Sequence, residues 1–237
     1  MPVLLTTAYF PPVQYFAALS QEAILRRGGK SVSAAPAVAF LEACENYQKQ
    51  SYRNRCHFYS ASGMQSLSFP VVHSENGYSL PIREIKVDYS TPWVRQHKMA
   101  IVSAYRTSAF FEYYQDELFA ILDSHPETLW ELNISLIQFF VRKIGIPVEF
   151  LLTEDYFKSE GIVAEGVWKG LPFNPSLDAV DLRQVIHPKR PDDILAMLGM
   201  EKPYFQVFAG KHGFIPNLSI MDLLFNEGPD AVSYLVR

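Results

Sequence analysis

The 237-residue chain contains only two cysteines, few charged side chains and no excess of basic residues. Charged residues make up 19% of the sequence and the formal net charge is −4, which argues against a general nucleic-acid-binding protein. No apolar run approaches the ~18–20 residues that span a bilayer, so we expect no membrane span. The first residues lack the cationic lead of a signal peptide, and we therefore expect a cytoplasmic protein.

Several common site signatures are also missing. Neither the G-x-S-x-G pattern of serine hydrolases nor the G-x-G-x-x-G dinucleotide fingerprint occurs. The six histidines never fall at metal-ligand spacing, so we expect no metal site, and no cofactor is indicated. Cys44 and Cys56 could in principle pair, but in a cytosol we expect two reduced thiols.

What remains is an apolar chain with alternating strand and helix patterns. Hydrophobic residues make up 49% of the sequence, enough for a core, and the length fits one domain over residues 1–237. The pattern predicts an α/β fold, a mixed sheet with packed helices and a β-hairpin insertion, and leaves the strand order open. The expected strands and hairpin are residues 2–7, 38–41, 56–72 around Ser62-Gly63, 82–87, 148–152 and 205–208.

The expected helices begin near Val13, at Trp93 and after a capping box formed by Ser124 and Glu127. A second capping box, Ser219 with Asp222, predicts a last helix. Residues 155–191 show no steady period, and no element is predicted there.

Residues 45–58 concentrate cations, amides and aromatic rings where the neighbouring sequence is apolar. Lys49, Arg53 and Arg55 offer positive charge, and arginine can fork onto a carboxylate or phosphate. This central stretch can hold a small anionic, hydroxyl-rich molecule such as a nucleotide or an activated sugar. The alternative is a polar loop with solvated charges and packed tyrosines.

Three stretches together resemble the WbqC-like family. The spacing Lys49-x-x-Tyr52-x-Asn54-Arg55 resembles its central motif, residues 9–16 its opening aromatic-proline motif and residues 214–229 its closing motif. The resemblance extends from about Leu4 to Pro229. Residues 155–191 depart from many members, which carry a longer helical stretch there.

The resemblance implies a function. The family occurs among bacterial surface-polysaccharide (O-antigen) genes, and a glycine-transferase role has been suggested for a member. It therefore implies a transferase in surface-polysaccharide precursor synthesis that moves a glycyl or similar acyl group to a sugar. The alternative is a non-catalytic protein that binds a sugar or nucleotide. In either case the expected partner is a small anionic or sugar-containing molecule, and the oligomeric state stays open.

The candidate site residues follow from the motifs and from the chemistry of acyl transfer. Lys49 and Arg55 are expected to bind the anionic part of the substrate, and Tyr52 and Asn54 to position it. Tyr9 and Gln14, at the turn after the first strand, are expected to face the same site or else to belong to a packed turn.

The acyl transfer also requires a base, and His57, His97, Glu45 or Glu42 can move the proton. His97, four residues after Trp93, occupies a position resembling the family's Trp-His pair. A packed or solvated histidine is the alternative there.

Overall fold

The computed structural model describes residues 1–27, 36–72, 80–159 and 161–235. Among these residues, five strands form one mixed sheet in the order β5-β2-β1-β7-β6, and β3 pairs with β4 in a separate antiparallel hairpin. The strands are β1 (Val3–Thr6), β2 (Ala37–Glu42), β3 (Arg55–Ser60), β4 (Gly63–Ser68), β5 (Val148–Leu152), β6 (Phe173–Asn174) and β7 (Ala179–Asp181). The prediction of an α/β fold with a mixed sheet and a hairpin is confirmed.

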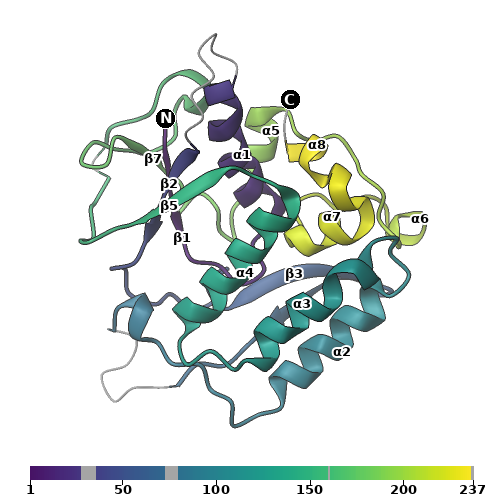
Figure 1. Ribbon diagram of the computed structural model, residues 1–237. Coiled ribbons are helices and arrows are strands. Elements are labelled where there is room, and N and C mark those ends of the chain that lie inside the picture. The colour runs from purple at the N-terminus through teal and green to yellow at the C-terminus, as the bar shows by residue number, and fades with distance from the viewer. Residues whose placement is uncertain (28–35, 73–79, 160, 236–237) are drawn as a thin grey trace.

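Helices lie against the sheet and beside the hairpin strand β3 (Figure 1). Their bounds are α1 (Val13–Arg27), α2 (Trp93–Tyr105), α3 (Phe111–Asp123), α4 (Leu129–Ile144), α5 (Asp193–Leu198), α6 (Ala209–His212), α7 (Ile220–Glu227) and α8 (Ala231–Leu235). Short 3-10 turns cover Ile82–Glu84, Gly166–Trp168 and Gly228–Asp230.

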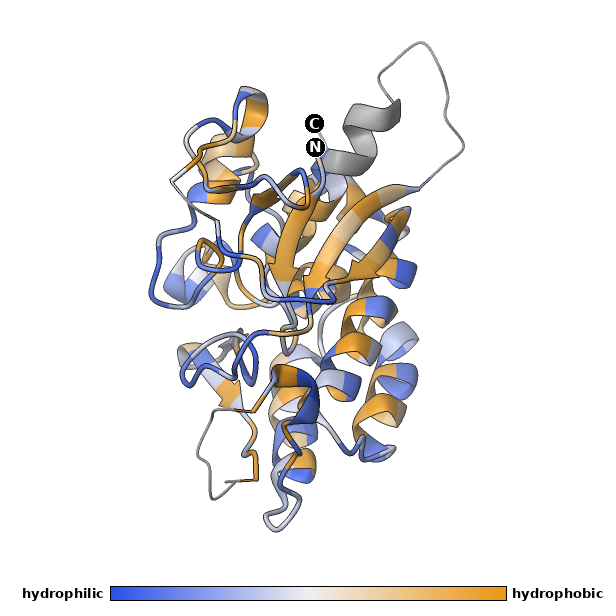
Figure 2. Ribbon diagram, turned by 90° about the vertical axis from the view of Figure 1, so that its left-hand side faces the viewer, coloured by the Kyte–Doolittle hydropathy of each residue, from blue (hydrophilic) through white to orange (hydrophobic). Residues whose placement is uncertain are grey.

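Strand order follows from the parallel pairing of the central strands. β1 pairs in parallel with β2 on one side and with β7 on the other, and β2 pairs in parallel with β5. Among the described strands of this sheet, only β6 runs antiparallel, at the edge beside β7. Parallel central strands are buried on both faces and are therefore continuously apolar, as the orange strands in Figure 2 show.

Aromatic rings join the helices into one core. Phe16 of α1 packs against Phe140 of α4 with ring centroids 6.1 Å apart. Phe225 of α7 packs edge-on against Tyr105 of α2 at 5.3 Å and Phe111 of α3 at 5.1 Å. Edge-to-face pairs of this kind stabilise a core by about 0.5–1.5 kcal/mol each beyond their buried area.

Some local predictions were wrong. The helix α4 is capped by Thr128, whose side chain accepts from the Glu131 backbone while the Glu131 carboxylate accepts from the Thr128 backbone. Ser124 instead follows α3, where its hydroxyl donates to the Ile121 carbonyl at 2.8 Å. Residues 82–87 contain a 3-10 turn and isolated bridges, residues 205–208 contain no strand, and β4 begins earlier than expected.

Candidate functional site

The carboxyl ends of the parallel strands meet at one edge of the sheet, and the strand order changes direction at β1. The chain builds β2 and then β5 on one side of β1 and returns to place β7 on the other side. In open α/β sheets such a switch point is where ligands usually bind. The segments that follow these strands carry the motifs of the sequence, so a ligand site is expected at this end of the sheet.

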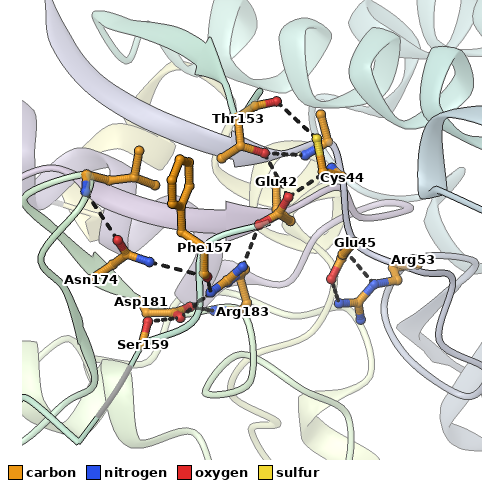
Figure 3. A network of polar contacts seen from close by, with 12 residues as sticks. Glu42, Cys44, Glu45, Arg53, Thr153, Phe157, Ser159, Asn174, Asp181 and Arg183 are labelled. Carbon is orange, nitrogen blue, oxygen red and sulfur yellow. Dashed lines mark hydrogen bonds and ion pairs between the residues drawn. The ribbon is translucent and has the colours of Figure 1, made fainter. Parts of the chain in front are cut away.

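Arg183 connects two strands across this edge. Its guanidinium donates to Glu42 at the end of β2 at 2.5 Å and to both carboxylate oxygens of Asp181 at the end of β7, at 3.0 and 2.7 Å. β1 lies between β2 and β7 in the sheet, so the two ion pairs of Arg183 connect the strands on either side of β1. Figure 3 shows Arg183 between Glu42 and Asp181. A pocket of about 360 Å³ opens beside Arg183.

Glu42 is completely buried, and both of its carboxylate oxygens accept hydrogen bonds. One oxygen accepts from the Thr153 hydroxyl at 2.7 Å and from the Cys44 backbone at 2.9 Å, and the other accepts from Arg183. Such full satisfaction indicates a structural carboxylate. Its role as a proton carrier remains a prediction without support from this geometry.

Glu45 and Arg53 form a second buried ion pair, at the start and near the end of the loop between β2 and β3. The guanidinium donates to both carboxylate oxygens, at 2.8 and 2.5 Å, and Arg53 is 1% exposed (Figure 3). The Asn133 amide of α4 donates to the Arg53 carbonyl at 2.7 Å. This bidentate pair fixes the shape of the loop and leaves neither carboxylate oxygen of Glu45 without a bond.

The opening motif, residues 9–16, lies directly against the loop between β2 and β3. The Tyr9 backbone N–H donates to the Tyr52 carbonyl at 2.8 Å, so the structure brings these two predicted residues together. The Tyr9 phenol is fully buried and makes a 2.8 Å hydrogen bond with Nδ1 of His97. His97 is itself 5% exposed, packed against Trp93 at 5.1 Å between ring centroids.

Burial lowers the pKa of His97 from 6.5 to about 4, so its ring is neutral near neutral pH. A depressed pKa stabilises the folded state above the unfolded-state pKa, and that contribution is lost as pH falls from about 6.5 toward 4 because only the unfolded chain takes up the proton. We expect the stability difference between wild type and His97→Gln to shrink by about 2 kcal/mol between about pH 7 and pH 5. Urea titrations of both proteins across this range measure the difference.

The buried Asp222 titrates in both proteins, since burial raises its pKa to about 6, and its contribution therefore cancels in the comparison. A difference that stays constant with pH would contradict a neutral buried His97.

Arg55 and His57 lie two residues apart on β3, so their side chains leave the same face of the strand. Both are half-buried, and Nε of Arg55 is buried without a hydrogen-bond partner in the described part of the chain. The glutamates Glu42 and Glu45 pair with other arginines, and Arg55 forms no ion pair among the described residues. Among the described residues Nε of Arg55 lacks a hydrogen-bond acceptor, which an anionic ligand would supply.

His57 differs from His97 in its surroundings. Its Nδ1 lies 2.9 Å from the Ser66 hydroxyl of β4, and its ring packs edge-on against Tyr52 at 5.9 Å. Burial and the nearby Arg55 charge lower the pKa of His57, while Asp192 opposes them. A half-buried neutral imidazole with a hydroxyl on one nitrogen has the properties of a general base.

Asp192 connects the closing motif to this cluster. Its carboxylate accepts from the Asn217 amide at 2.5 Å, and the Asn217 oxygen accepts from the Gln14 backbone at 3.0 Å. Burial raises the pKa of Asp192, and its charge acts on both His57 and Tyr52. Both polar atoms of the Gln14 side chain are buried without a partner in the described residues.

The remaining predicted residues lie at the margin. Asn54 donates to the Phe69 carbonyl at 2.8 Å and so holds the β3–β4 hairpin. Lys49 is exposed at the tip of the loop, where neighbouring Gln50 accepts from Lys189 at 2.7 Å. The basic turn at residues 187–190 thus contacts the loop between β2 and β3.

The structure brings Tyr52 and His57 into contact and sets Arg55 on the same strand face as His57. Gln14 is linked to Asp192 through Asn217, and Tyr9 and His97 are hydrogen-bonded to each other in the core. The structure sets Glu45 apart in an ion pair. Sequence reasoning missed Arg183 and Asp192, which lie in or just after the stretch without a period. Asn217 belongs to the closing motif, and its place in that motif is the sequence signal that could have identified it as a site residue. In the described residues no group of three or more His, Cys, Asp or Glu side chains could hold a metal ion, and both cysteines carry free thiols.

Fold and site define an α/β protein with a polar cluster at the carboxyl edge of a mostly parallel sheet. The model of the WbqC-like protein family matches residues 31–171, more than half of the chain, and the protein belongs to this family. The opening and closing motifs lie outside the matched range.

A curated relative, "Uncharacterized protein Rv1507c" of Mycobacterium tuberculosis, is 26% identical over 197 residues, which cover 80% of this chain and 83% of the relative. No solved structure matches the chain. No helix of the described residues has the length and apolar character required to cross a membrane.

Proposed function

We propose that the protein is a transferase in the synthesis of a bacterial surface-polysaccharide precursor, and that it moves a glycyl or similar acyl group to a sugar. The family resemblance supports the process, and the cluster of Arg55, His57 and Asp192 supports the chemistry. The single observation that carries the proposal concerns one face of β3, where Arg55, which has no ionic partner among the described residues, lies beside a half-buried His57 of lowered pKa.

In the proposed reaction an amine or hydroxyl of the sugar attacks the carbonyl carbon of the acyl donor. His57 removes the proton from the attacking group as the new bond to carbon forms, and the bond to the donor's leaving group breaks. Arg55 binds an anionic group of the substrate and stabilises negative charge that develops on the carbonyl oxygen. The leaving group takes the proton from His57, which restores the base.

Tyr52 and Gln14 position the substrate in this proposal. The ring of Tyr52 is mostly buried, and a hydrogen bond from the Tyr9 backbone fixes the Tyr52 backbone. Gln14 offers a donor and an acceptor that no described residue uses. Unsatisfied buried polar groups are costly, so their persistence is consistent with a ligand that completes them. Lys49 adds positive charge at the exposed tip of the loop.

The test is a product assay. Purified protein is incubated with pairs of one nucleotide-sugar and one activated glycyl or acyl donor, and the acylated sugar is sought by mass spectrometry. Wild type should form product with at least one pair and release the free leaving group in equal amount. Binding of nucleotide-sugars without product from any donor would overturn transfer and leave a binding protein.

One observation favours that second candidate, a non-catalytic sugar- or nucleotide-binding protein. Three of the four predicted proton carriers, Glu42, Glu45 and His97, are committed to buried contacts. If His57 also serves only to hydrogen-bond a ligand, its replacement will weaken binding in proportion to any apparent loss of activity.

A further inference from the structure

A groove of about 760 Å³ runs between α2 and α3, away from the candidate site. Figure 1 shows the two helices side by side at the outside of the molecule. Val94, Met99, Val102 and Phe119 give the groove its apolar lining, and none of the residues assigned to the candidate site contributes to it. Met99 is 61% exposed, and Tyr113 of α3 is 78% exposed, so both helices present large apolar groups to solvent.

The side of α2 that borders the groove is basic. Arg95, Met99, Val102 and Arg106 follow the spacing i, i+4, i+7 and i+11, which places them in one line along the helix and its C-cap. α2 contains no acidic residue. Arg95 and Arg106 are exposed and form no ion pair with any residue that the structure describes.

The corresponding side of α3 is acidic. Glu112, Asp116, Phe119 and Asp123 have the same spacing, and α3 contains no lysine or arginine. Asp123 is paired with Lys98 of α2 at 2.6 Å. Glu112 and Asp116 are exposed and, within the described ranges, have no ionic partner.

The two helices form an antiparallel hairpin, and the Lys98–Asp123 pair sets their relative register. The Arg106 end of α2 therefore lies beside the Glu112 end of α3. Within the described part of the chain, this face thus carries two cations without ionic partners on α2 and two anions without ionic partners on α3, with apolar side chains between them.

We propose that this face binds a second copy of the chain. With a two-fold axis parallel to the helices, α2 of one copy lies over α3 of its partner, and the reverse contact forms at the same time. Arg106 then meets Asp116 of the other copy twice, and the apolar groups of both grooves are buried together. A two-fold axis across the helices would instead place α2 on α2, with like charges opposed.

Charge balance selects this occupant. A strongly acidic or basic partner would match one helix and be repelled by the other, whereas a second copy matches both. Self-complementarity is the general requirement of an isologous two-fold interface. Complementary charges fix the register of such a contact, and like charges opposite each other disfavour it strongly.

The test uses two single charge reversals, Arg106→Glu and Asp116→Arg, in the full chain. Wild type should show a concentration-dependent monomer–dimer equilibrium by sedimentation velocity between about 1 and 200 μM. Each reversal opposes two pairs of like charges in its own homodimer and should raise the dissociation constant at least about tenfold. Circular dichroism melts confirm that each variant is folded.

Mixing the two variants gives the decisive result. In the mixed dimer both contacts regain opposite charges, because Glu at 106 faces Arg at 116 and Arg106 faces Asp116. We expect dimers in the mixture at concentrations where each variant alone is monomeric. A monomeric wild type, or a mixture no more associated than its components, would overturn the proposal. Neither result depends on whether the protein is a transferase.

Discussion

Replacement of Arg183 by methionine should lower the free energy of unfolding by about 3–5 kcal/mol, the largest stability effect that we expect. The change leaves the completely buried Glu42 carboxylate without its cation, and it removes the connection between the ends of β2 and β7. Removal of one partner of a buried ion pair is costly because the other charge stays in a medium that solvates it poorly. Denaturant titration of the variant measures the loss.

Lys86→Met provides the matched control. The Lys86–Glu127 pair has a similar separation, 2.6 Å, but its side chains are 60% and 69% exposed. Exposed ion pairs contribute little to stability, so this variant should remain close to wild type. Equal losses of unfolding free energy for Arg183→Met and Lys86→Met would contradict the assignment of Arg183 as a buried structural link.

Replacement of His57 by glutamine should lower kcat about 100- to 10,000-fold, the range typical for loss of a general base. Glutamine keeps a polar group near Ser66 but accepts no proton at neutral pH. KM should change little, because substrate binding is assigned to Arg55, Tyr52 and Gln14. Steady-state kinetics with the donor and sugar pair that yields product measures both constants.

His212→Gln is the corresponding control, because His212 is exposed and bonds to the Ala61 carbonyl at the far end of the hairpin. It should retain full activity. A His57 variant that keeps its kcat while KM rises would show that the ring only binds substrate.

Strong local signals were sufficient to predict much of the fold. Apolar β-branched runs identified β1, β2 and β5, and the helical period after Trp93 identified α2. The three-residue strand β7 was missed, because a segment so short shows no period, although its pairing with β1 determines where the strand order reverses. Its position depends on contacts between distant segments, which a pattern along the chain does not contain.

Local signals also led to part of the candidate site, whose role stays a prediction. The central motif indicated Tyr52, Arg55 and His57 because their types and spacing were informative by themselves. The separation of His57 from Glu45 was not predictable, since both were plausible bases until the bidentate bond of Glu45 to Arg53 was known. Asp192 acts on His57 only because the chain folds a segment 135 residues away onto the hairpin.

The most direct measurement compares Arg55→Lys with wild type in two melting experiments, one without ligand and one with a nucleotide-sugar that wild type binds. Arg55 forms no ion pair within the described residues, so the variant should melt near the wild-type temperature without ligand. Lysine cannot reproduce two parallel donors, and we expect binding to weaken by ~1.5–3 kcal/mol, about ten- to a hundredfold, with a smaller ligand-induced shift. A large loss of melting temperature without ligand, together with an unchanged ligand-induced shift, would contradict a ligand-binding role for Arg55.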